Sequence, residues 1–368
     1  MKILIVQDFL RSGGTERQSV LLANAFAAAG HRTTLLTFRP GGALAPTVVT
    51  SVARHVLQPL DFRADWFAPG LTAAARRLAP DVVLCMGRMA NCYAGGLQSD
   101  LPAARVIATM RTGKPLPRLF RRSLATVSHV VANSRDARDT LVNTYGVAAE
   151  KIAVIYNSLI FPAGSERVGG APSPRDTLRS KHGATPATAV LLCVAMFRPE
   201  KNQRELIEIA AGLPADCDWQ LWLAGDGPAR TACEQLAATK GLTARVQFVG
   251  FHRDPSALYA AADVAVHASW SEALSNFLIE AQAHGVPAVA YAAQGIEECF
   301  VPGQTGWEIR RDDRAAFRAA LLRLLAEPGA GRVARSAAAR AFARETFDPS
   351  RQVTAYLDLF QRLLRAAP

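Results

Sequence analysis

The chain has 368 residues, of which 50% are hydrophobic and 20% charged, and its 42 Lys or Arg against 31 Asp or Glu give a formal charge of +11. This composition excludes a disordered chain, and the length favours two domains of ordinary size. No stretch of the sequence approaches the roughly 20 continuous apolar residues of a membrane span.

The N-terminus and the cysteines indicate a reducing cytosol. The apolar run Met1–Val6 is too short for the core of a signal peptide and has no small-residue cleavage site. It predicts a buried first strand. The six cysteines are scattered and form no C-x-x-C pair, so a zinc site or a disulfide framework is not expected.

The positive charge lies almost entirely in the first half. Residues 1–165 contain 19 Lys or Arg against 9 Asp or Glu, whereas residues 166–368 contain 23 against 22. Two interpretations remain open. The chain could come from an Arg-rich proteome, or its first half alone could bind an anionic partner.

Short apolar runs alternate with amphipathic segments of helix length, which is typical of a parallel sheet covered by helices on both faces. Helices are predicted over Arg17–Ala29 and Asp136–Tyr145, each followed by a glycine. The strands predicted in the first half are Lys2–Asp8, Thr33–Phe38, Val82–Cys85, Arg105–Met110 and Val127–Ala132.

The alternation stops over Pro162–Pro186, which is rich in Pro, Gly and Ser and predicts a linker or a long loop. It then resumes, with helices predicted over Asn202–Gly212 and Pro228–Lys240 and a mostly helical tail over Arg314–Pro368, broken at Asp348-Pro349. The strands predicted in the second half are Ala189–Ala195, Gln220–Ala224, Arg245–Val249, Val264–His267 and Ala288–Tyr291.

We therefore predict an α/β protein with two doubly wound, Rossmann-like domains that face each other across a cleft. The boundaries are 1–160 for the first domain, 161–188 for the linker and 189–346 for the second domain, with a last helix at 347–368 that crosses back to the first domain. Ligands of such sheets bind at the carboxyl ends of the strands, so the chemistry is expected in the cleft.

Two short motifs follow predicted first strands. Gly13-Gly14 lets a backbone approach a phosphate at a helix start, although a tight turn without a ligand explains it equally well. Arg198 and Lys201 follow the first strand of the second half and would suit a diphosphate. A solvated basic turn is the alternative for this pair.

The segment Ser269–Glu280 is the most informative. Glu272 lies on the loop after strand Val264–His267, and Glu280 falls in the first turns of a helix that Ser275 or Asn276 would cap. Glu280 could accept hydrogen bonds from a ribose and Glu272 from a sugar, while the amides of Leu274–Phe277 would meet phosphate. The alternative is a surface Glu and a first-turn Glu favoured by the helix dipole.

The spacing Glu272-x(7)-Glu280 resembles the E-x(7)-E signature of family 4 retaining glycosyltransferases, which have the GT-B fold. The resemblance covers nearly the whole chain. The other segments that carry it are Gly13-Gly14-Thr15-Glu16-Arg17, Val131–Ser134, Val154–Ser158, Arg198 with Lys201, and Ala224–Pro228.

The resemblance implies transfer of a sugar, with retention of configuration, from a nucleotide diphosphate sugar to a hydroxyl of a glycan or lipid-linked acceptor. A UDP-sugar is favoured, and no cofactor or metal is expected. The first domain would bind the acceptor and the second the donor. The implied catalytic residues are Arg198, Lys201 and Glu272, and the implied donor-binding residues are these three with Gly13, Gly14, Ala273, Leu274, Ser275, Asn276 and Glu280.

The sequence departs from the family pattern in three places. Ala273 stands where many relatives have Gly, and Gln294-Gly295 with Glu298 stands for a Gly-Gly motif before a third Glu. No His follows strand Arg105–Met110, where many relatives carry one near the donor sugar. Arg111 or a residue elsewhere must serve there, and Arg111 and Lys114 are the candidate acceptor-side residues.

The sequence Asp216-Cys217-Asp218 has the D-x-D form that metal-dependent glycosyltransferases of the other main fold use. It precedes an apolar run, whereas a metal site is expected after a strand, so we interpret it as a loop and predict no metal.

The basic stretch Arg111–Leu124 places its leucines and Phe120 at helical spacing and its arginines on another face. Such a helix could bind an anionic membrane surface from the cytoplasmic side, or it could pack on its sheet. A nucleotide-sugar epimerase, or another GT-B enzyme without an acceptor, is the alternative function. A non-enzymatic binding protein is a further one. Nucleic acid is suggested only by charge.

Overall fold

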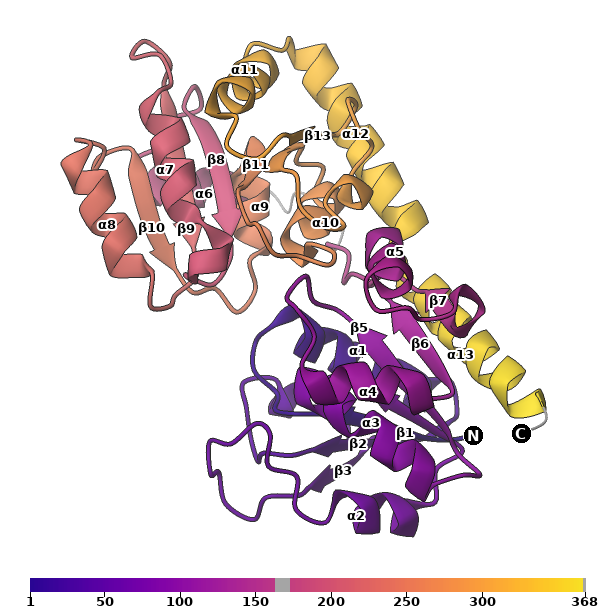
Figure 1. Cartoon of the computed structure of the whole chain (residues 1–368). Helices are drawn as coiled ribbons and strands as arrows, with labels where there is room; N and C mark the ends of the chain where they lie inside the picture. Colours follow the sequence, from indigo (N-terminus) through magenta and orange to yellow (C-terminus); the bar gives the residue numbers. More distant parts are fainter. Residues whose placement is uncertain (163–172, 367–368) are drawn as a thin grey trace. The chain divides into compact units, whose positions relative to one another are not determined.

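The structure is a computed structural model that describes residues 1–162 and 173–366 (Figure 1). Contacts divide the chain into two compact units, the first formed by Met1–Ser158 with Pro349–Pro368 and the second by Leu159–Asp348. Each unit is an α/β domain built on one parallel sheet, which confirms the predicted pair of doubly wound, Rossmann-like domains.

The first unit contains a seven-stranded sheet in the order β3-β2-β1-β4-β5-β6-β7, with every neighbouring pair parallel. The order reverses between β1 and β4, so the loops that leave these two strands diverge to opposite faces at the carboxyl edge. The strands are β1 (Lys2–Gln7), β2 (Arg32–Thr37), β3 (Ala53–Val56), β4 (Val82–Cys85), β5 (Arg105–Met110), β6 (His129–Ala132) and β7 (Ile152–Val154).

Helices cover both faces of this sheet, because both faces of its central strands are apolar. On β1, Leu4 and Val6 enter one core and Ile3 and Ile5 the other. The helices are α1 (Gly14–Ala28), α2 (Leu71–Leu78), α3 (Arg88–Asp100), α4 (Arg118–Thr126), α5 (Arg135–Asn143) and α13 (Pro349–Arg365), with short 3-10 turns η1 (Ala45–Thr47) and η2 (Ala149–Lys151).

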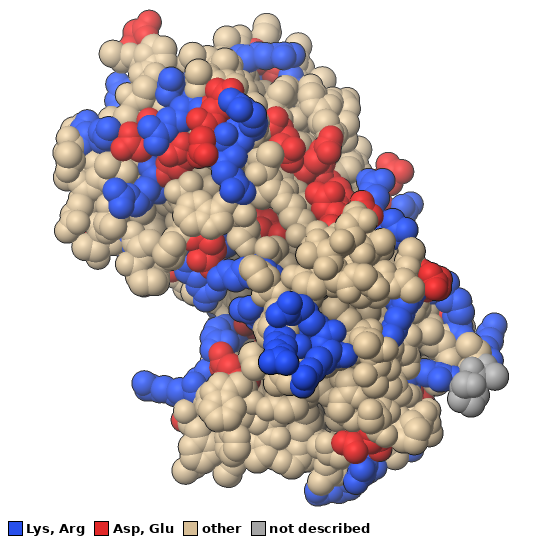
Figure 2. Space-filling model, viewed as in Figure 1, with Lys and Arg blue, Asp and Glu red and all other residues tan. Residues whose placement is uncertain are grey.

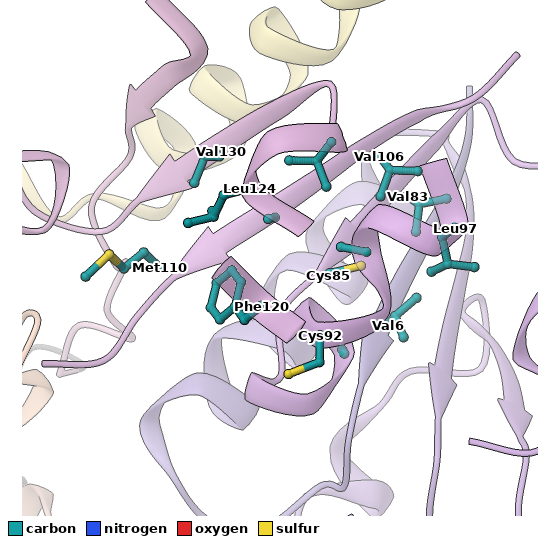
Figure 3. Close-up of a cluster of buried hydrophobic side chains, with 14 of the residues drawn as sticks. Val6, Val83, Cys85, Cys92, Leu97, Val106, Met110, Phe120, Leu124 and Val130 are labelled. Carbon is teal, nitrogen blue, oxygen red and sulfur yellow. The ribbon is translucent and has the colours of Figure 1, made fainter. Parts of the chain in front are cut away.

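One core lies under α3 and α4, where Phe120 and Leu124 pack toward Val6, Val83 and Cys85 (Figure 3). The two helices approach closely at Gly95, because a Cβ atom there would lie 2.9 Å from the Cα of Ser123. On the opposite face, α13 packs against α1, with the ring of Phe26 5.6 Å from that of Phe360 and 6.1 Å from that of Tyr356.

The second unit repeats the plan with six parallel strands in the order β10-β9-β8-β11-β12-β13, which reverses between β8 and β11. The strands are β8 (Ala189–Val194), β9 (Trp219–Ala224), β10 (Val246–Gly250), β11 (Val264–His267), β12 (Ala288–Tyr291) and β13 (Gly306–Ile309). The helices are α6 (Pro174–Lys181), α7 (Gln203–Ala211), α8 (Arg230–Thr239), α9 (Ser256–Ala261), α10 (Asn276–Ala283), α11 (Arg314–Leu325) and α12 (Gly329–Thr346), with 3-10 turns η3 (Pro199–Lys201) and η4 (Glu297–Cys299).

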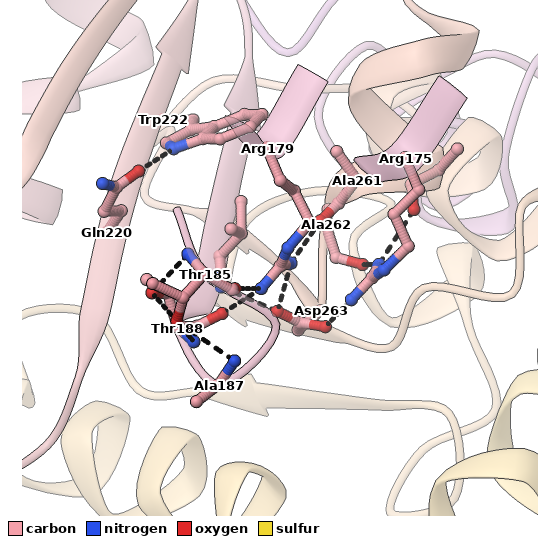
Figure 4. Close-up of polar contacts among 12 residues, drawn as sticks. Arg175, Arg179, Thr185, Ala187, Thr188, Gln220, Trp222, Ala261, Ala262 and Asp263 are labelled. Carbon is pink, nitrogen blue, oxygen red and sulfur yellow. Dashed lines mark hydrogen bonds and ion pairs between the residues drawn. The ribbon is translucent and has the colours of Figure 1, made fainter. Parts of the chain in front are cut away.

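Helix α6 lies where the sequence predicts a linker or loop, and that prediction is wrong for Pro174–Lys181; residues 163–172 lie outside the described residues. Ser173 caps the helix by accepting a hydrogen bond from the amide of Asp176 at 3.1 Å. Arg175 and Arg179 then fasten it to the sheet through Asp263 (Figure 4). The N-cap and the two ion pairs with Asp263 therefore stabilise a helix whose sequence has no apolar periodicity.

Within the described ranges, every helix falls short of the length and apolar character needed to cross a membrane.

Candidate active site

The loop after β8 carries the two predicted phosphate-binding cations. Arg198 is exposed, and Lys201 ends the 3-10 turn η3 just before α7. The turn after β9 supports this loop, because Gly225 and Gly227 have φ values of 132° and 147°. A Cβ atom on Gly225 would lie 2.1 Å from the carbonyl oxygen of Ala195, so only glycine allows this approach.

Lys201 and Glu272 come together across the reversal point of the sheet. The Nζ atom of Lys201 lies 2.5 Å from Oε1 of Glu272, and the Glu272 side chain is only 10% exposed. Nε2 of His267, the last residue of β11, lies 3.1 Å from the same carboxylate oxygen. The sequence predicted Lys201 and Glu272 for this site and placed His267 at the start of the Glu272 loop; the structure shows that His267 contacts Glu272.

Glu272 is held as a carboxylate. Burial raises its pKa, but the charge of Lys201 and the hydrogen bond from His267 together lower the pKa to about 2. The tautomer of His267 follows from its other nitrogen, because Nδ1 accepts the backbone N–H of Ser269 at 3.1 Å. Nε2 therefore carries the hydrogen, and this N–H donates a hydrogen bond to the Glu272 carboxylate.

Backbone contacts fix the Glu272 loop to the Lys201 loop. The carbonyl oxygen of Glu200 accepts hydrogen bonds from Oγ of Ser269 at 2.9 Å and from the amide of Trp270 at 3.1 Å. Since Glu200 precedes Lys201, these bonds fix the position of one loop relative to the other. The ion pair is therefore supported by backbone contacts between the two loops as well as by its own side chains.

Helix α10 begins directly after this loop. Ser275 is its N-cap and accepts the amide of Leu278 at 3.5 Å, and Asn276 is the first helical residue. Ala273 and Leu274 are buried. Glu280, the fifth residue of the helix, accepts a hydrogen bond from Oη of the buried Tyr259 at 2.6 Å.

Arg198 lines a cavity of about 450 Å³ together with residues of α7 and Trp270. Neither Lys201, Glu272 nor Glu280 borders this cavity.

In the first unit, Gly13 is the N-cap of α1, Gly14 is its first residue, and Glu16 lies in its first turn. Asp8, at the carboxyl end of β1, was missed by the sequence reasoning. Its carboxylate accepts the amides of Met89 at 3.0 Å and Ala90 at 2.7 Å, at the start of α3. Burial raises the pKa of Asp8 to about 6, against the lowering effect of those two amides.

Arg111 is engaged within the first unit. Its guanidinium donates to Oδ1 of Asn157 at 2.5 Å and to Oη of Tyr356 on α13 at 2.8 Å. Lys114 is half-buried, and its amide donates to Oγ1 of Thr112. The structure therefore gives Arg111 a role inside its own unit, which the sequence did not predict.

Two family models match the chain, one for each half. The model described as Glycosyltransferase Family 4 matches residues 12–159, and that described as Glycosyl transferases group 1 matches residues 188–327. Together they span more than half of the chain. The chain belongs to the group 1, family 4 glycosyltransferases.

Members of this glycosyltransferase family resemble the chain in sequence. LpsE of Rhizobium meliloti, a lipopolysaccharide core biosynthesis glycosyltransferase, is 34% identical over 39% of this chain and 42% of its own length. A GDP-mannose-dependent alpha-(1-6)-phosphatidylinositol dimannoside mannosyltransferase of Mycobacterium tuberculosis is 28% identical over 81% of both chains. The chain spans less than half the length of LpsE and of other curated relatives that it matches at 30–34% identity.

The GT-B fold is confirmed by solved structures. HepE of Anabaena, solved in complex with UDP-glucose, is 22% identical, with a TM-score of 0.80 over 98% of this chain and 100% of its own. Both family models describe glycosyl transferases, so the epimerase alternative is not favoured.

The structure brings Lys201 and Glu272 into contact at the carboxyl ends of β8 and β11. Two other predicted residues lie in the same unit, Arg198 on the loop after β8 and Glu280 within α10. The sequence did not predict that His267 contacts Glu272 or that Tyr259 contacts Glu280. The position of His267 at the end of a buried strand was a usable signal, because such a side chain meets the following loop. Tyr259 lies in α9, and no pattern in the sequence connects it to Glu280.

Proposed function

We propose that this chain transfers a sugar, with retention of configuration, from a nucleotide diphosphate sugar to a hydroxyl of a glycan or lipid-linked acceptor. Synthesis of a cell-surface polysaccharide or glycolipid is the proposed setting. The observation that carries the proposal is the ion pair of Lys201 with Glu272, on loops that leave the two strands where the sheet order reverses. That edge is where ligands bind in doubly wound sheets.

The proposed roles follow from charge and position. Lys201 has three N–H donors and uses one on Glu272, so it can donate to a diphosphate oxygen without leaving its partner. Arg198 is exposed at the start of the turn that Lys201 ends, and among the described residues its guanidinium has no ion pair. Together the two cations would stabilise the negative charge of the leaving diphosphate.

Two carboxylates would hold the rest of the donor. Glu272 remains ionised at neutral pH and can accept hydrogen bonds from sugar hydroxyls. Glu280 would accept from ribose hydroxyls, with Tyr259 fixing its orientation. Ala273, Leu274, Ser275 and Asn276 would present their amides to phosphate at the start of α10, and Gly13 and Gly14 are proposed as further donor-binding residues in the first unit.

In the proposed reaction, the bond between the anomeric carbon and the diphosphate oxygen breaks, and a bond forms between that carbon and the acceptor oxygen on the same face. The acceptor proton passes to a phosphate oxygen, and the nucleotide diphosphate leaves. No protein nucleophile is needed. No metal ion or other cofactor is needed in this scheme, because Arg198 and Lys201 supply the positive charge that the leaving group requires.

A UDP-sugar is proposed as the donor. In support, HepE, which shares the fold over the full length, was solved with UDP and with UDP-glucose. The Mycobacterium tuberculosis relative is GDP-mannose-dependent by name, so GDP-sugars are the comparison that a binding experiment must include.

The acceptor would bind to the first unit, with Arg111 and Lys114 as the proposed contacts. Peripheral association with the inner face of the membrane is proposed as well. In its support, Arg118, Arg121 and Arg122 are exposed on α4 while Phe120 and Leu124 pack into the core.

The test is a thermal-shift and titration series with UDP, GDP, UDP-glucose and GDP-mannose. We expect UDP to stabilise the protein, and Lys201→Ala to weaken UDP binding about 10- to 100-fold, as loss of a charged hydrogen bond predicts. Lys240→Ala is the matched control, since Lys240 also pairs with a glutamate of the second unit, at 3.0 Å from Glu208.

A chain that responds to no nucleotide, or a Lys201→Ala variant that binds UDP like the Lys240→Ala control, would contradict the proposal. EDTA should leave UDP binding unchanged. Product analysis with the donor alone tests the epimerase, which would isomerise the sugar without any acceptor.

A further inference from the structure

The loop between β3 and α2, residues 57–70, exposes an unusual set of large apolar side chains; we call it the aromatic loop. Leu60 is 70% exposed, Phe62 53%, Trp66 63% and Phe67 37%. The ring of Phe67 lies 5.9 Å from that of Phe62 and 6.0 Å from that of Trp66. The three rings therefore form one cluster on the surface, and such clusters mark interaction sites.

The backbone of the aromatic loop is held in place by side chains from within and below it. Nε2 of Gln58 donates to the carbonyl oxygens of Ala64 at 2.8 Å and Phe67 at 2.6 Å. Oη of Tyr93, on α3, donates to the carbonyl oxygen of Trp66 at 2.5 Å. A loop fixed in this way keeps its apolar side chains outside instead of folding them into the core.

The acidic side chains of the aromatic loop are paired with arginines of the first unit, although Asp61 is still 39% exposed and Asp65 34%. Arg39, whose side chain is only 9% exposed, binds Asp61 at 2.7 Å and Asp65 at 2.7 Å, and Arg11 binds Asp65 at 2.6 Å. A bound sugar would need hydrogen-bonding side chains beside the rings. Here both carboxylates are already paired with arginine, so the exposed side chains beside the rings are those of Leu60, Arg63 and the paired Asp61.

Helix α3 contacts both the aromatic loop and the basic helix α4. Tyr93 contacts the loop, and the carbonyl oxygen of the preceding residue, Cys92, accepts Oγ of Ser123 on α4 at 3.1 Å. Lys and Arg side chains gather where α4 lies (Figure 2). Among the arginines of α4, Leu119 is 55% exposed.

We propose that the aromatic loop inserts its side chains into the interfacial layer of an anionic lipid bilayer, while the arginines of α4 bind the lipid headgroups. Exposed Trp, Phe and Leu beside Arg is the combination that this layer favours, because the rings bury apolar area and the guanidinium groups meet phosphate. The inference rests on the proposed membrane association and assigns its apolar contact to a second segment, which the sequence did not indicate.

The test is co-sedimentation of the full chain with vesicles of phosphatidylcholine and phosphatidylglycerol. We expect the double variant Phe62→Ser/Trp66→Ser to lower vesicle binding at least about tenfold. Val333→Ser, which removes a side chain that is 72% exposed on α12, is the control and should bind as the wild type does. The variant Arg121→Gln/Arg122→Gln should weaken binding at low salt and remove its salt dependence.

A second readout reports insertion directly. Acyl chains brominated near the headgroup should quench part of the wild-type tryptophan fluorescence, and Trp66→Phe, which keeps an aromatic side chain, should abolish that quenching while retaining vesicle binding. UDP binding, measured on the same variants, should not change, which separates this inference from the proposed donor site.

Three outcomes overturn the inference. If the wild type binds no anionic vesicle at low salt, both this inference and the proposed membrane association are wrong. If the loop variant binds as well as the control and no quenching occurs, only α4 contacts the membrane. If light scattering shows instead that the loop variant turns a dimer into a monomer, the aromatic cluster binds a second copy of the chain.

Discussion

The two units share one strand order, yet they use the carboxyl edge of the sheet differently. In the second unit, the loops after β8 and β11 bring Lys201, Glu272 and His267 together. At the same edge of the first unit, Asp8 caps α3 instead, and its carboxyl group accepts hydrogen bonds from two backbone amides. Both sheets therefore offer the same edge for a ligand site, and the side chains at that edge determine whether it binds a ligand or stabilises the fold.

The amino edge of the second sheet shows the structural use of charge within that same unit. Asp263 precedes β11 and binds Arg175 at 2.7 Å and Arg179 at 3.1 Å, while its other partner is the amide of Val190 at 2.8 Å. Strand β11 thus has a structural carboxylate before it and a proposed functional carboxylate after it. Three predictions test this division.

The largest effect is expected at Arg179, whose side chain is 4% exposed. It donates to Asp263 and to the carbonyl oxygens of Ala261, Thr185 and Thr188. Arg179→Met leaves these acceptors without their donor, so the free energy of unfolding should fall by about 3–5 kcal/mol. Urea denaturation followed by tryptophan fluorescence measures this, since four of the five tryptophans belong to the second unit.

The matched control is Arg175→Met, because Arg175 binds the same aspartate but is 37% exposed. Its cost should stay below about 1 kcal/mol. Equal losses for the two variants would show that Arg179 is no more than a surface ion pair. UDP affinity should be unchanged in both, because the amino edge is not the proposed donor site.

The contacts of Arg179 also show which parts of the fold could not be predicted from the sequence. The central strands and most helices could be predicted, because buried strands are continuous apolar runs and helices end at glycines. The edge strands β3, β7 and β13 were missed, since they are short and only partly buried. Helix α6 was missed because its stability comes from Arg179, which reaches residues about 80 positions away in the chain.

The candidate site could be predicted only in part, because some of its contacts join residues that no sequence motif connects. Arg198, Lys201, Glu272 and Glu280 could be found from motif spacing and the family resemblance. The contacts of Glu272 with His267 and of Glu280 with Tyr259 depend on how loops and helices pack, and Asp8 acts on a helix that begins 80 residues later. Such contacts have no local pattern, so they appear only in the folded chain.

The second prediction tests whether Asp8 is a structural acid. Its pKa is raised from 3.8 to about 6 in the folded state, so the protonated form is favoured by folding. The stability that Asp8 contributes is complete below about pH 4 and is lost as the pH rises through about 6. Relative to Asp8→Asn, the wild type should therefore lose about 2–3 kcal/mol of unfolding free energy between pH 4 and pH 7, measured by urea denaturation with circular dichroism.

Asp65→Asn is the comparison for this pH series. Burial raises the pKa of Asp65, but Arg39 and Arg11 hold it below its usual value, so its pH dependence has the opposite sign. A wild type whose stability rose with pH over the same range, relative to Asp8→Asn, would show that the two amides of α3 outweigh burial. Asp8 would then be a charged cap rather than a neutral one.

The smallest effect is expected at His267, which acts on the proposed reaction only through Glu272. His267→Leu removes one hydrogen bond to the carboxylate, so kcat for sugar transfer from the donor identified by the binding series should fall about 5- to 15-fold, with little change in KM. Because the lost bond lowers the pKa of Glu272, that pKa should rise from about 2 toward its ordinary value. The acid limb of the kcat profile should move to higher pH accordingly.

His267→Gln separates positioning from packing, because its amide Nε2 can still donate to Glu272 while the ring that stacks on Phe277, 6.0 Å away, is lost. Recovery of kcat and of the acid limb in His267→Gln is expected if the hydrogen bond is what matters. If Gln and Leu behave alike, the stacked ring supports the loop by packing alone. In that case the carboxyl edge of the second sheet would rely on Lys201 alone to hold Glu272, much as the first sheet relies on backbone amides to hold Asp8.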